Sequence, residues 1–278
     1  MSLFYYDAGS HDSPVMFLVH GLGDEADTWR SVILPLSQRF RVVAPDLPGF
    51  GRSSLPRHRL APKYLARVLL ELMAALHLTT VTGVGSSLGA VLLQQAAAME
   101  PARFQRLVLE DGGLGADGKL NPSLLLMLIP GLGERRYRGL SRNPAAAYMS
   151  LRPYYADLDG MPESDREFLR QRVSDRVSSD TQRRAYLSAL RGYIGWLALF
   201  GRSAKRNNRF LGKPFLRIWG AQDRIIPLPV VKAASDQEPG PGLAVIEGAG
   251  HLPHQEKPRE FMRIVLDFAD ARGVSLTA

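Results

Sequence analysis

Short apolar runs that end at or next to a glycine recur along this chain and constrain its fold more than any other feature. Each run is continuously apolar, which is typical of a strand buried on both faces of a sheet. Helix-like segments separate most of the runs, as parallel strands require. The predicted strands are residues 15–20, 41–49, 81–84, 106–111, 215–220 and 243–248. This order predicts an α/β fold with a mostly parallel, twisted sheet and helices on both faces.

The alternation stops between residues 112 and 212, where the patterns are helical and no strand is convincing. Strand signals resume at residue 215, so the helical block interrupts one sheet rather than starting a second. We therefore predict a core domain formed by residues 1–112 and 213–278. A helical cap, or lid, is predicted as an insertion at 113–212.

The sequence VTGVGSSLGAVLLQ (residues 81–94) predicts a strand, a tight turn and a helix that begins at about Leu88. A serine at such a corner is pushed out of the sheet, and the corner needs small residues two positions before and after it. Gly85 and Gly89 meet this need for Ser87, whereas the equivalent neighbours of Ser86 would clash. Ser87 is the candidate nucleophile. The alternative is a glycine-rich turn whose serine only caps the helix.

A serine nucleophile needs a base, and the base needs an acid that orients it. Catalytic groups of parallel sheets gather at the carboxyl ends of strands, so the residues that directly follow the predicted strands are the candidates. Asp223 follows the strand at 215–220, and His251 follows the strand at 243–248. Asp223 could instead be a turn former and His251 a structural residue, and Asp111 is a competing acid.

The tetrahedral intermediate of acyl transfer needs two backbone N–H donors for its negatively charged oxygen. Leu88, directly after the candidate nucleophile, supplies one amide, and Leu22 in the glycine-flanked sequence HGLG supplies the other. The alternative for HGLG is a plain glycine-rich turn. His20 is expected to brace this loop rather than move protons. The other histidines are assigned to the surface (His11, His58 and His77) and to a helix entry or pocket edge (His254).

Five segments, in this order, resemble the α/β-hydrolase superfamily: FLVHGLGDEADTW, VVAPDLPGFGRSS, VGSSLGAVL, IWGAQDRIIP and GAGHLPHQEKP. They are similar to its oxyanion loop, the next strand and loop, the nucleophile elbow, the acid loop and the histidine loop. The resemblance implies a Ser-His-Asp acyl-transfer mechanism with a helical lid, and no cofactor or metal ion. Ser87 differs from the aspartate nucleophile of haloalkane dehalogenases and epoxide hydrolases. Only one strand-like stretch, LFYY, precedes residue 15, so the usual eight-stranded sheet is expected to lack its first strand.

The composition and charge of the chain limit the kinds of site, location and partner to be expected. The chain has no cysteine, so disulfides, thiolate metal sites and a cysteine nucleophile are excluded. It shows no signal peptide and no apolar stretch of about 20 residues, so we expect a cytoplasmic protein without a membrane span. The net charge of +8 comes from basic residues interleaved with acidic ones, so no nucleic-acid partner is expected, although peripheral contact with lipid is compatible with it. The oligomeric state is left open.

The leading interpretation is a serine carboxylesterase, lipase-like, that acts on small-molecule esters of apolar acyl groups. Leu124, Leu128, Trp196 and Phe200 of the predicted cap are candidates for lining an acyl pocket, although such residues more often pack helices together. A carbon–carbon bond hydrolase of diketone ring-cleavage products uses the same triad, and LEDGGLGADG (109–118) resembles such enzymes. A non-catalytic receptor for a small lactone or ester is the third alternative.

Overall fold

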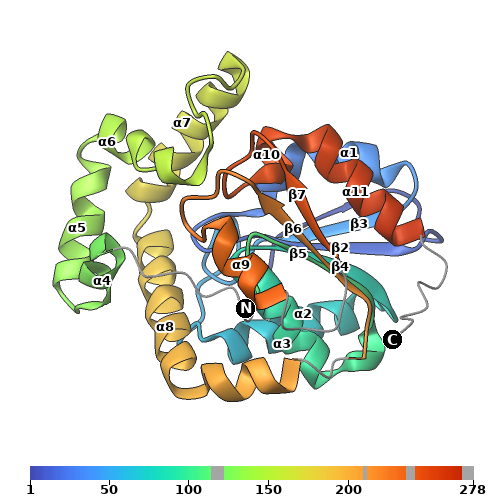
Figure 1. The fold of residues 1–278 in the computed structure, drawn as a ribbon. Helices are drawn as coiled ribbons and strands as arrows, with labels where there is room; N and C mark the ends of the chain where they lie inside the picture. The colour runs from blue at the N-terminus through green and yellow to red at the C-terminus, as the bar shows by residue number, and fades with distance from the viewer. Residues whose placement is uncertain (114–121, 209–211, 236–241, 271–278) are drawn as a thin grey trace.

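The computed structural model describes residues 1–113, 122–208, 212–235 and 242–270 (Figure 1). Its centre is a seven-stranded sheet in the order β1-β3-β2-β4-β5-β6-β7. Only β1 runs antiparallel to its neighbour; every other pair of neighbours is parallel. The strands are β1 (Tyr5–Ala8), β2 (Val15–Val19), β3 (Arg41–Pro45), β4 (Val81–Ser86), β5 (Phe104–Glu110), β6 (Phe215–Gly220) and β7 (Leu243–Ile246). Seven strands, with a single one before β2, agree with the expected loss of the first strand.

Helices cover both faces of this sheet (Figure 1). The helices of the core are α1 (Arg30–Ser37), α2 (Pro62–Ala75), α3 (Leu88–Met99), α9 (Leu228–Ser235), α10 (Pro253–Glu256) and α11 (Pro258–Asp270). Single 3₁₀ turns lie at Ala26–Trp29, Pro101–Arg103 and Arg152–Tyr154. The sequence patterns predict core helices at residues 28–38, 61–78, 88–100, 227–235 and 258–273, and these agree with the observed bounds to within a few residues. Residues 271–273, at the predicted end of the last helix, lie outside the described residues.

The side chains of β2 show how the sheet divides the core. Successive side chains of a strand point to opposite faces. Met16 and Leu18 therefore pack in the cluster with α1 and α11, whereas Phe17 and Val19 pack in the cluster with α2 and α3. All four are fully buried, which explains the continuously apolar sequence of this strand.

In the described part of the chain between β5 and β6, the regular structure is helical, and loops connect the helices. Its helices are α4 (Pro122–Leu128), α5 (Leu132–Ser141), α6 (Pro144–Met149), α7 (Glu163–Ser178) and α8 (Asp180–Asn208). This inserted helical region, residues 124–200, lies beside the core in Figure 1. The domain limits of 113–212 for the cap, and of 1–112 and 213–278 for the core, stay predictions. Residues 114–121 and 209–211, near both limits, lie outside the described residues.

Helix α8 packs against both parts of the molecule. Ala185 and Ala189 are buried in the core cluster that includes α2 and α3. Leu187 and Leu190 pack instead with Met127 of α4. One long helix therefore connects the other inserted helices to the core.

Ion pairs hold α7 against the loop that follows β2. Arg172 bonds to Glu25, whose side chain is only 2% exposed. A terminal nitrogen of Arg176 lies 3.1 Å from a carboxylate oxygen of Asp24. The inserted region is thus bound directly to the loop that is predicted to hold the oxyanion.

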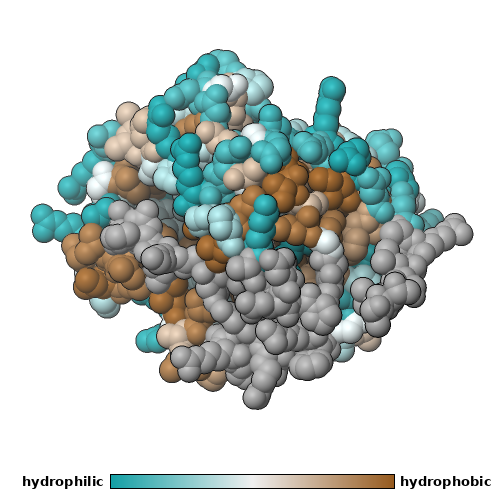
Figure 2. All heavy atoms as spheres, in the orientation of Figure 1, coloured by the Kyte–Doolittle hydropathy of each residue, from teal (hydrophilic) through white to brown (hydrophobic). Residues whose placement is uncertain are grey.

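The outer surface of the inserted region is partly apolar. Figure 2 shows apolar side chains gathered at the left of the molecule, where Figure 1 places α4. Leu125 is 45% exposed there and Ile129, just after the helix, is 50% exposed. No helix in the described part of the chain is long and apolar enough to cross a membrane.

Candidate active site

Ser87 lies at the corner between β4 and α3. Its φ of 52° is in the left-handed region, which is strained for a residue with a side chain. A Cβ atom at Gly85 would lie 2.5 Å from the carbonyl carbon of Gly89, and a Cβ atom at Gly89 would lie 2.1 Å from the carbonyl oxygen of Val19. Both positions therefore require glycine, as predicted. The N–H of Ser87 donates to the carbonyl oxygen of Glu110 at 2.8 Å, which fixes the corner to the end of β5.

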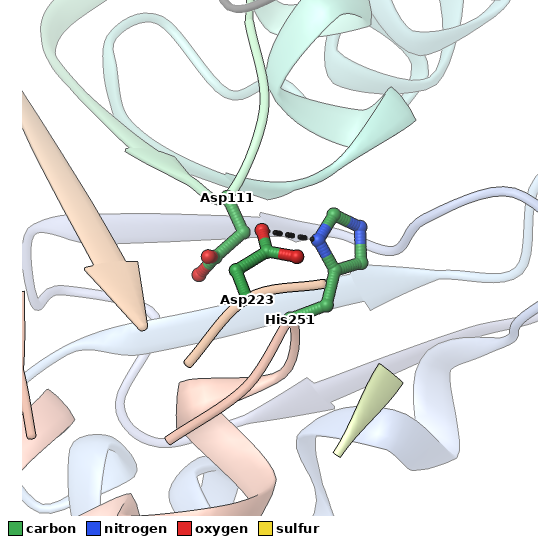
Figure 3. A group of neighbouring side chains, drawn as sticks. All are labelled: Asp111, Asp223 and His251. Carbon is green, nitrogen blue, oxygen red and sulfur yellow. Dashed lines mark hydrogen bonds and ion pairs between the residues drawn. The ribbon is translucent and has the colours of Figure 1, made fainter. Parts of the chain in front are cut away.

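His251 and Asp223 meet Ser87 at this corner. Nε2 of His251 lies 3.0 Å from Oγ of Ser87, and Nδ1 lies 2.8 Å from Oδ2 of Asp223 (Figure 3). Both His251 and Asp223 are buried. The three residues follow β4, β6 and β7, so one edge of the sheet brings together side chains up to 164 positions apart in the sequence. With the Nδ1 proton donated to Asp223, the lone pair of Nε2 faces the serine hydroxyl.

The turn after β6 orients Asp223. Its Oδ1 accepts the N–H groups of Ile225 and Ile226 at 2.7 and 3.0 Å, which leaves Oδ2 for His251. Figure 3 shows the carboxyl group of Asp223 between Asp111 and the imidazole ring. The acid in contact with the ring is therefore Asp223, while Asp111, the competing acid, lies behind it.

Asp111 follows β5 and is fully buried. Its Oδ1 accepts the N–H of Gly220 at 3.1 Å, and its Oδ2 has no hydrogen-bond partner in the part of the chain that the structure describes. Burial, followed by the negative charges of Asp223 and Glu110, raises the pKa of Asp111 well above its ordinary value. This carboxyl group plays no part in the expected triad, and its environment is one that ionised groups avoid.

Among the described residues, the acidic and histidine side chains that cluster closely enough to be compared with a metal site are Asp111, Asp223 and His251. One ligand atom from each lies within 4.8 Å of the other two. Both ring nitrogens of His251 already face protein groups, Asp223 on one side and Ser87 on the other. A metal ion would have to displace one of these contacts, so the arrangement fits proton transfer better than metal binding.

The loop after β2 passes close to the candidate nucleophile. A Cβ atom at Gly21 would lie 3.2 Å from the Cβ of Ser87. Leu22 follows in this loop, and Leu88 begins α3 directly after Ser87. The structure thus brings both predicted amide donors to the same corner, and their bonds to an oxyanion stay a prediction.

His20 braces this loop from inside the core. Its Nε2 accepts the N–H of Leu47 at 2.9 Å, so its Nδ1 carries the proton that is donated to the carbonyl oxygen of Gly21 at 2.8 Å. Burial lowers the pKa of His20, although nearby Asp24 and Asp46 oppose the effect. A neutral ring with both nitrogens occupied agrees with the bracing role.

A model of the alpha/beta hydrolase fold matches residues 14–258 of the chain. The chain belongs to the α/β-hydrolase family. The matched segment contains Ser87, Asp223 and His251, together with all the inserted helices.

Three relatives show how broad the family is around this hydrolase. An uncharacterized protein of Mycobacterium tuberculosis is 31% identical over 266 residues, which are 95% of this chain and 76% of the relative. A 2-hydroxy-6-oxononadienedioate/2-hydroxy-6-oxononatrienedioate hydrolase of Dechloromonas aromatica is 28% identical, covering 96% of this chain and 90% of the relative. A pimeloyl-[acyl-carrier protein] methyl ester esterase of Edwardsiella ictaluri is 26% identical, covering 98% and 99%.

Two solved structures share the fold of this hydrolase. A thermophilic esterase from Thermogutta terrifontis superposes with a TM-score of 0.75 at 24% identity, covering 96% of this chain and 92% of the esterase. The 2-hydroxy-6-oxo-6-phenylhexa-2,4-dienoate hydrolase of Rhodococcus sp. strain RHA1 superposes with a TM-score of 0.78 at 23% identity, covering 96% and 94%. The similarity to these structures shows the fold, and the substrate is a separate question.

The inserted region of the hydrolase contacts the histidine loop through residues that the sequence did not single out. The N–H of His251 donates to the carbonyl oxygen of Tyr154 at 2.7 Å, and the two rings meet edge to face at 5.8 Å. Glu256 accepts the N–H of Gly250 at 2.6 Å and that of Ala156 at 2.8 Å. One carboxylate therefore links the histidine loop to the insertion. The only sequence signal for Glu256 is its place in GAGHLPHQEKP.

The remaining histidines fall into two groups. His254 lies in the first turn of α10 and is fully buried, where it stacks on Trp29 at 4.1 Å and bonds to Glu110 and Thr28. This position agrees with a helix entry and not with a pocket edge. The residues assigned to the surface, His11, His58 and His77, are exposed.

The four apolar residues predicted to line a pocket have three different environments. Leu124 and Leu128 are partly buried against Met127 and its neighbours. Trp196 is 8% exposed and packs in the core cluster with α2 and α3. Phe200 is 54% exposed. The structure does not bring these side chains into one cluster, and core packing accounts for the burial of Trp196.

Proposed function

We propose that this hydrolase is a serine carboxylesterase, lipase-like, that cleaves esters of apolar acyl groups. The supporting observation is the continuous chain of contacts from Asp223 through His251 to Ser87, at 2.8 and 3.0 Å. These distances lie within the reach of general-base catalysis. The esterase from Edwardsiella ictaluri, similar over nearly the whole length of both chains, gives further support.

In the proposed acylation, Ser87 Oγ attacks the ester carbonyl carbon while Nε2 of His251 takes the hydroxyl proton. The carbonyl oxygen becomes an oxyanion that accepts hydrogen bonds from the amides of Leu22 and Leu88. Asp223 stabilises the imidazolium. His251 then gives its proton to the leaving alcohol, the carbon–oxygen bond breaks, and the acyl group remains on Ser87.

Deacylation repeats the same steps with water. His251 takes a proton from water, the resulting hydroxide attacks the acyl carbonyl, and a second oxyanion forms between the same amides. The bond to Ser87 Oγ breaks and His251 returns the proton to that oxygen. The products are an alcohol and a carboxylic acid.

A second candidate is hydrolysis of a carbon–carbon bond in a vinylogous diketone from ring cleavage. The observation that favours it is the 28% identity with the oxononadienedioate hydrolase of Dechloromonas aromatica over 96% of this chain. The LEDGG part of the 109–118 sequence lies at the end of β5, and residues 114–118 lie outside the described residues.

The first test measures initial hydrolysis rates of p-nitrophenyl esters from acetyl to palmitoyl, for the wild type and Ser87→Ala. We expect a clear chain-length optimum and a loss of at least about 10⁴-fold in the variant, because no other group can form the acyl-enzyme. The unfolding transition of Ser87→Ala should match that of the wild type. Full esterase activity in the variant would overturn the proposal.

The same preparations should then be assayed with a 2-hydroxy-6-oxo-dienoate. Rapid turnover of this compound with poor turnover of every ester would replace the esterase proposal by the carbon–carbon hydrolase. Saturable binding of a lactone without turnover of either substrate would indicate a receptor. A cytoplasmic location and peripheral contact with lipid stay predictions beside this proposal.

A further inference from the structure

Three buried carboxyl groups lie at the ends of β5 and β6, next to only two histidines. Glu110 bonds to His254 at 2.7 Å, and Asp223 bonds to His251 at 2.8 Å. The third acid, Asp111, follows Glu110 in the sequence and lies beside Asp223 in space (Figure 3). It is the acid of this group without a histidine as hydrogen-bond partner.

The two oxygens of Asp111 differ in their surroundings. Oδ1 accepts the N–H of Gly220 at 3.1 Å, whereas Oδ2 is buried and has no hydrogen-bond partner among the described residues. An ionised Asp111 would place a second negative charge next to Asp223, away from water. Burial and a neighbouring like charge both disfavour ionisation, and they raise the pKa of Asp111 well above its usual value. Protonation converts the repulsion into a hydrogen bond, because a neutral carboxyl group has an O–H donor.

We propose that Asp111 is a neutral carboxylic acid at neutral pH, and that its Oδ2–H donates a hydrogen bond to the carboxylate of Asp223. Asp111 is then a positioning residue, because it touches neither the substrate nor the reacting atoms and acts through Asp223. The inference rests on the proposed Ser87–His251–Asp223 mechanism.

The proton on Asp111 limits the negative charge beside the imidazole to that of Asp223. A second carboxylate next to Asp223 would add negative charge that stabilises the imidazolium form of His251 and weakens the ring as an acceptor for the proton of Ser87. A neutral Asp111 thus holds the carboxylate of Asp223 in place and leaves His251 able to act as the general base.

The other titratable groups near the pair already have partners or lie against His251. Glu110 accepts two bonds from His254, through its N–H and its ring. Tyr154 packs against the ring of His251, and Arg176 acts on the pKa of Tyr154 rather than on Asp111. The unpartnered Oδ2 of Asp111 remains the group placed to donate to Asp223.

The first arm of the test compares Asp111→Asn and Asp111→Ala in the pH dependence of kcat/KM for the best ester. The asparagine side chain can accept the N–H of Gly220 and donate to Asp223, so it reproduces the hydrogen bonds of the neutral acid. We therefore expect kcat/KM of Asp111→Asn to fall at acidic pH (the acid limb of the profile) at the same pH as that of the wild type. Alanine cannot donate, and we expect kcat/KM to fall by roughly 10-fold or more. An ionised Asp111 predicts instead that Asp111→Asn shifts the acid limb to lower pH by about 1–3 units, which would overturn the proposal.

The second arm does not depend on activity. A carboxyl group whose pKa is higher in the folded than in the unfolded protein makes its full contribution to stability below the unfolded pKa of about 3.9. This contribution is lost as the pH rises towards the folded pKa. Asp111→Asn has no such loss, so its free energy of unfolding should increase relative to the wild type between about pH 4 and neutral pH. A difference that is independent of pH would overturn the proposal.

Infrared spectroscopy supplies a direct signature. The wild type at neutral pH should show the carbonyl stretch of a protonated carboxylic acid, and Asp111→Asn should lack it. Absence of this band from the wild type would refute a neutral Asp111 even if the hydrolase activity were confirmed. Presence of the band with an inactive protein would instead refute the proposed function, so the two failures are distinguishable.

Discussion

At the scale of the residue, the choice between two adjacent serines depends on what surrounds each one. The Oγ of Ser86, at the end of β4, is buried and has no hydrogen-bond partner among the residues described. The Oγ of Ser87, one residue later in a left-handed conformation, faces His251. Gly85 and Gly89 permit this geometry because the strand and the helix come into backbone contact there.

Gly89→Ala should therefore destabilise the protein. Its Cβ atom would lie 2.1 Å from the carbonyl oxygen of Val19, so the backbone of either α3 or β2 must shift. We expect a loss of about 2 kcal/mol or more in the free energy of unfolding, measured by urea denaturation.

The matched control is Gly195→Ala in the middle of α8. No atom of the described segments lies within 4 Å of a Cβ atom at Gly195, and alanine is the better helix former. This change should stabilise the protein by roughly 0.5–1 kcal/mol. If the two variants had equal stability, the close-packing argument at Gly89 would fail.

At the scale of the element, α7 is the helix whose position depends most on charge. Its sequence has few apolar residues, and only Leu169 and Val173 are buried. Arg172 and Arg176 bond to Glu25 and Asp24 in the loop after β2. The position of α7 against the loop after β2 thus depends on partly buried ion pairs.

Arg172→Met should loosen this contact. Removing the guanidinium leaves the carboxylate of Glu25, which is 2% exposed, without its main partner. Breaking a buried pair is costly, and we expect a loss of roughly 3 kcal/mol in the free energy of unfolding, together with faster amide exchange in α7.

Arg170→Met on the same helix is the control. Arg170 pairs with Glu163 and Glu167, which are exposed, so its replacement should have little effect. Equal losses in Arg170→Met and Arg172→Met would show that helix α7 responds to its net charge rather than to the pair with Glu25.

At the scale of the whole molecule, a buried carboxylate joins the N-terminal segments around the sheet. Asp46, directly after β3, accepts the N–H of Ala26 at 2.7 Å and bonds to both the backbone and the side chain of Arg52. Burial alone would raise the pKa of Asp46, but these bonds outweigh it and hold the pKa below its usual value.

The global stability should accordingly decrease in acid. A carboxyl group whose pKa is lowered by folding stabilises the protein above its unfolded pKa of about 3.9, and this stability is lost as the pH falls through the folded pKa. Asp46→Asn should be less stable than the wild type at pH 7 and should lose less stability below about pH 4. Urea denaturation across this range tests it, with Asp12→Asn, at an exposed position, as the control expected to follow the wild type.

The sequence by itself determined the features that depend on local sterics and on the order of the elements. The apolar runs identified six of the seven strands, because each strand is covered on both faces. The glycines at 85 and 89 selected Ser87, because the contact that requires them is made within a few residues. Asp223 and His251 could be found because the carboxyl ends of parallel strands always meet at one edge of the sheet.

Only the tertiary structure decided which side chains meet across the molecule. Asp111 and Asp223 both follow strands of the sheet, and the sequence favoured Asp223 while it kept Asp111 as a competing acid. Which acid contacts His251 depends on how the carboxyl ends of β5, β6 and β7 lie relative to one another in the sheet. The same holds for Trp196, which packs in the core rather than with Leu124. Sequence patterns indicate which face of its own helix or strand a residue occupies. Distances between elements depend on how side chains from several elements pack together, and no single segment of the sequence encodes that packing.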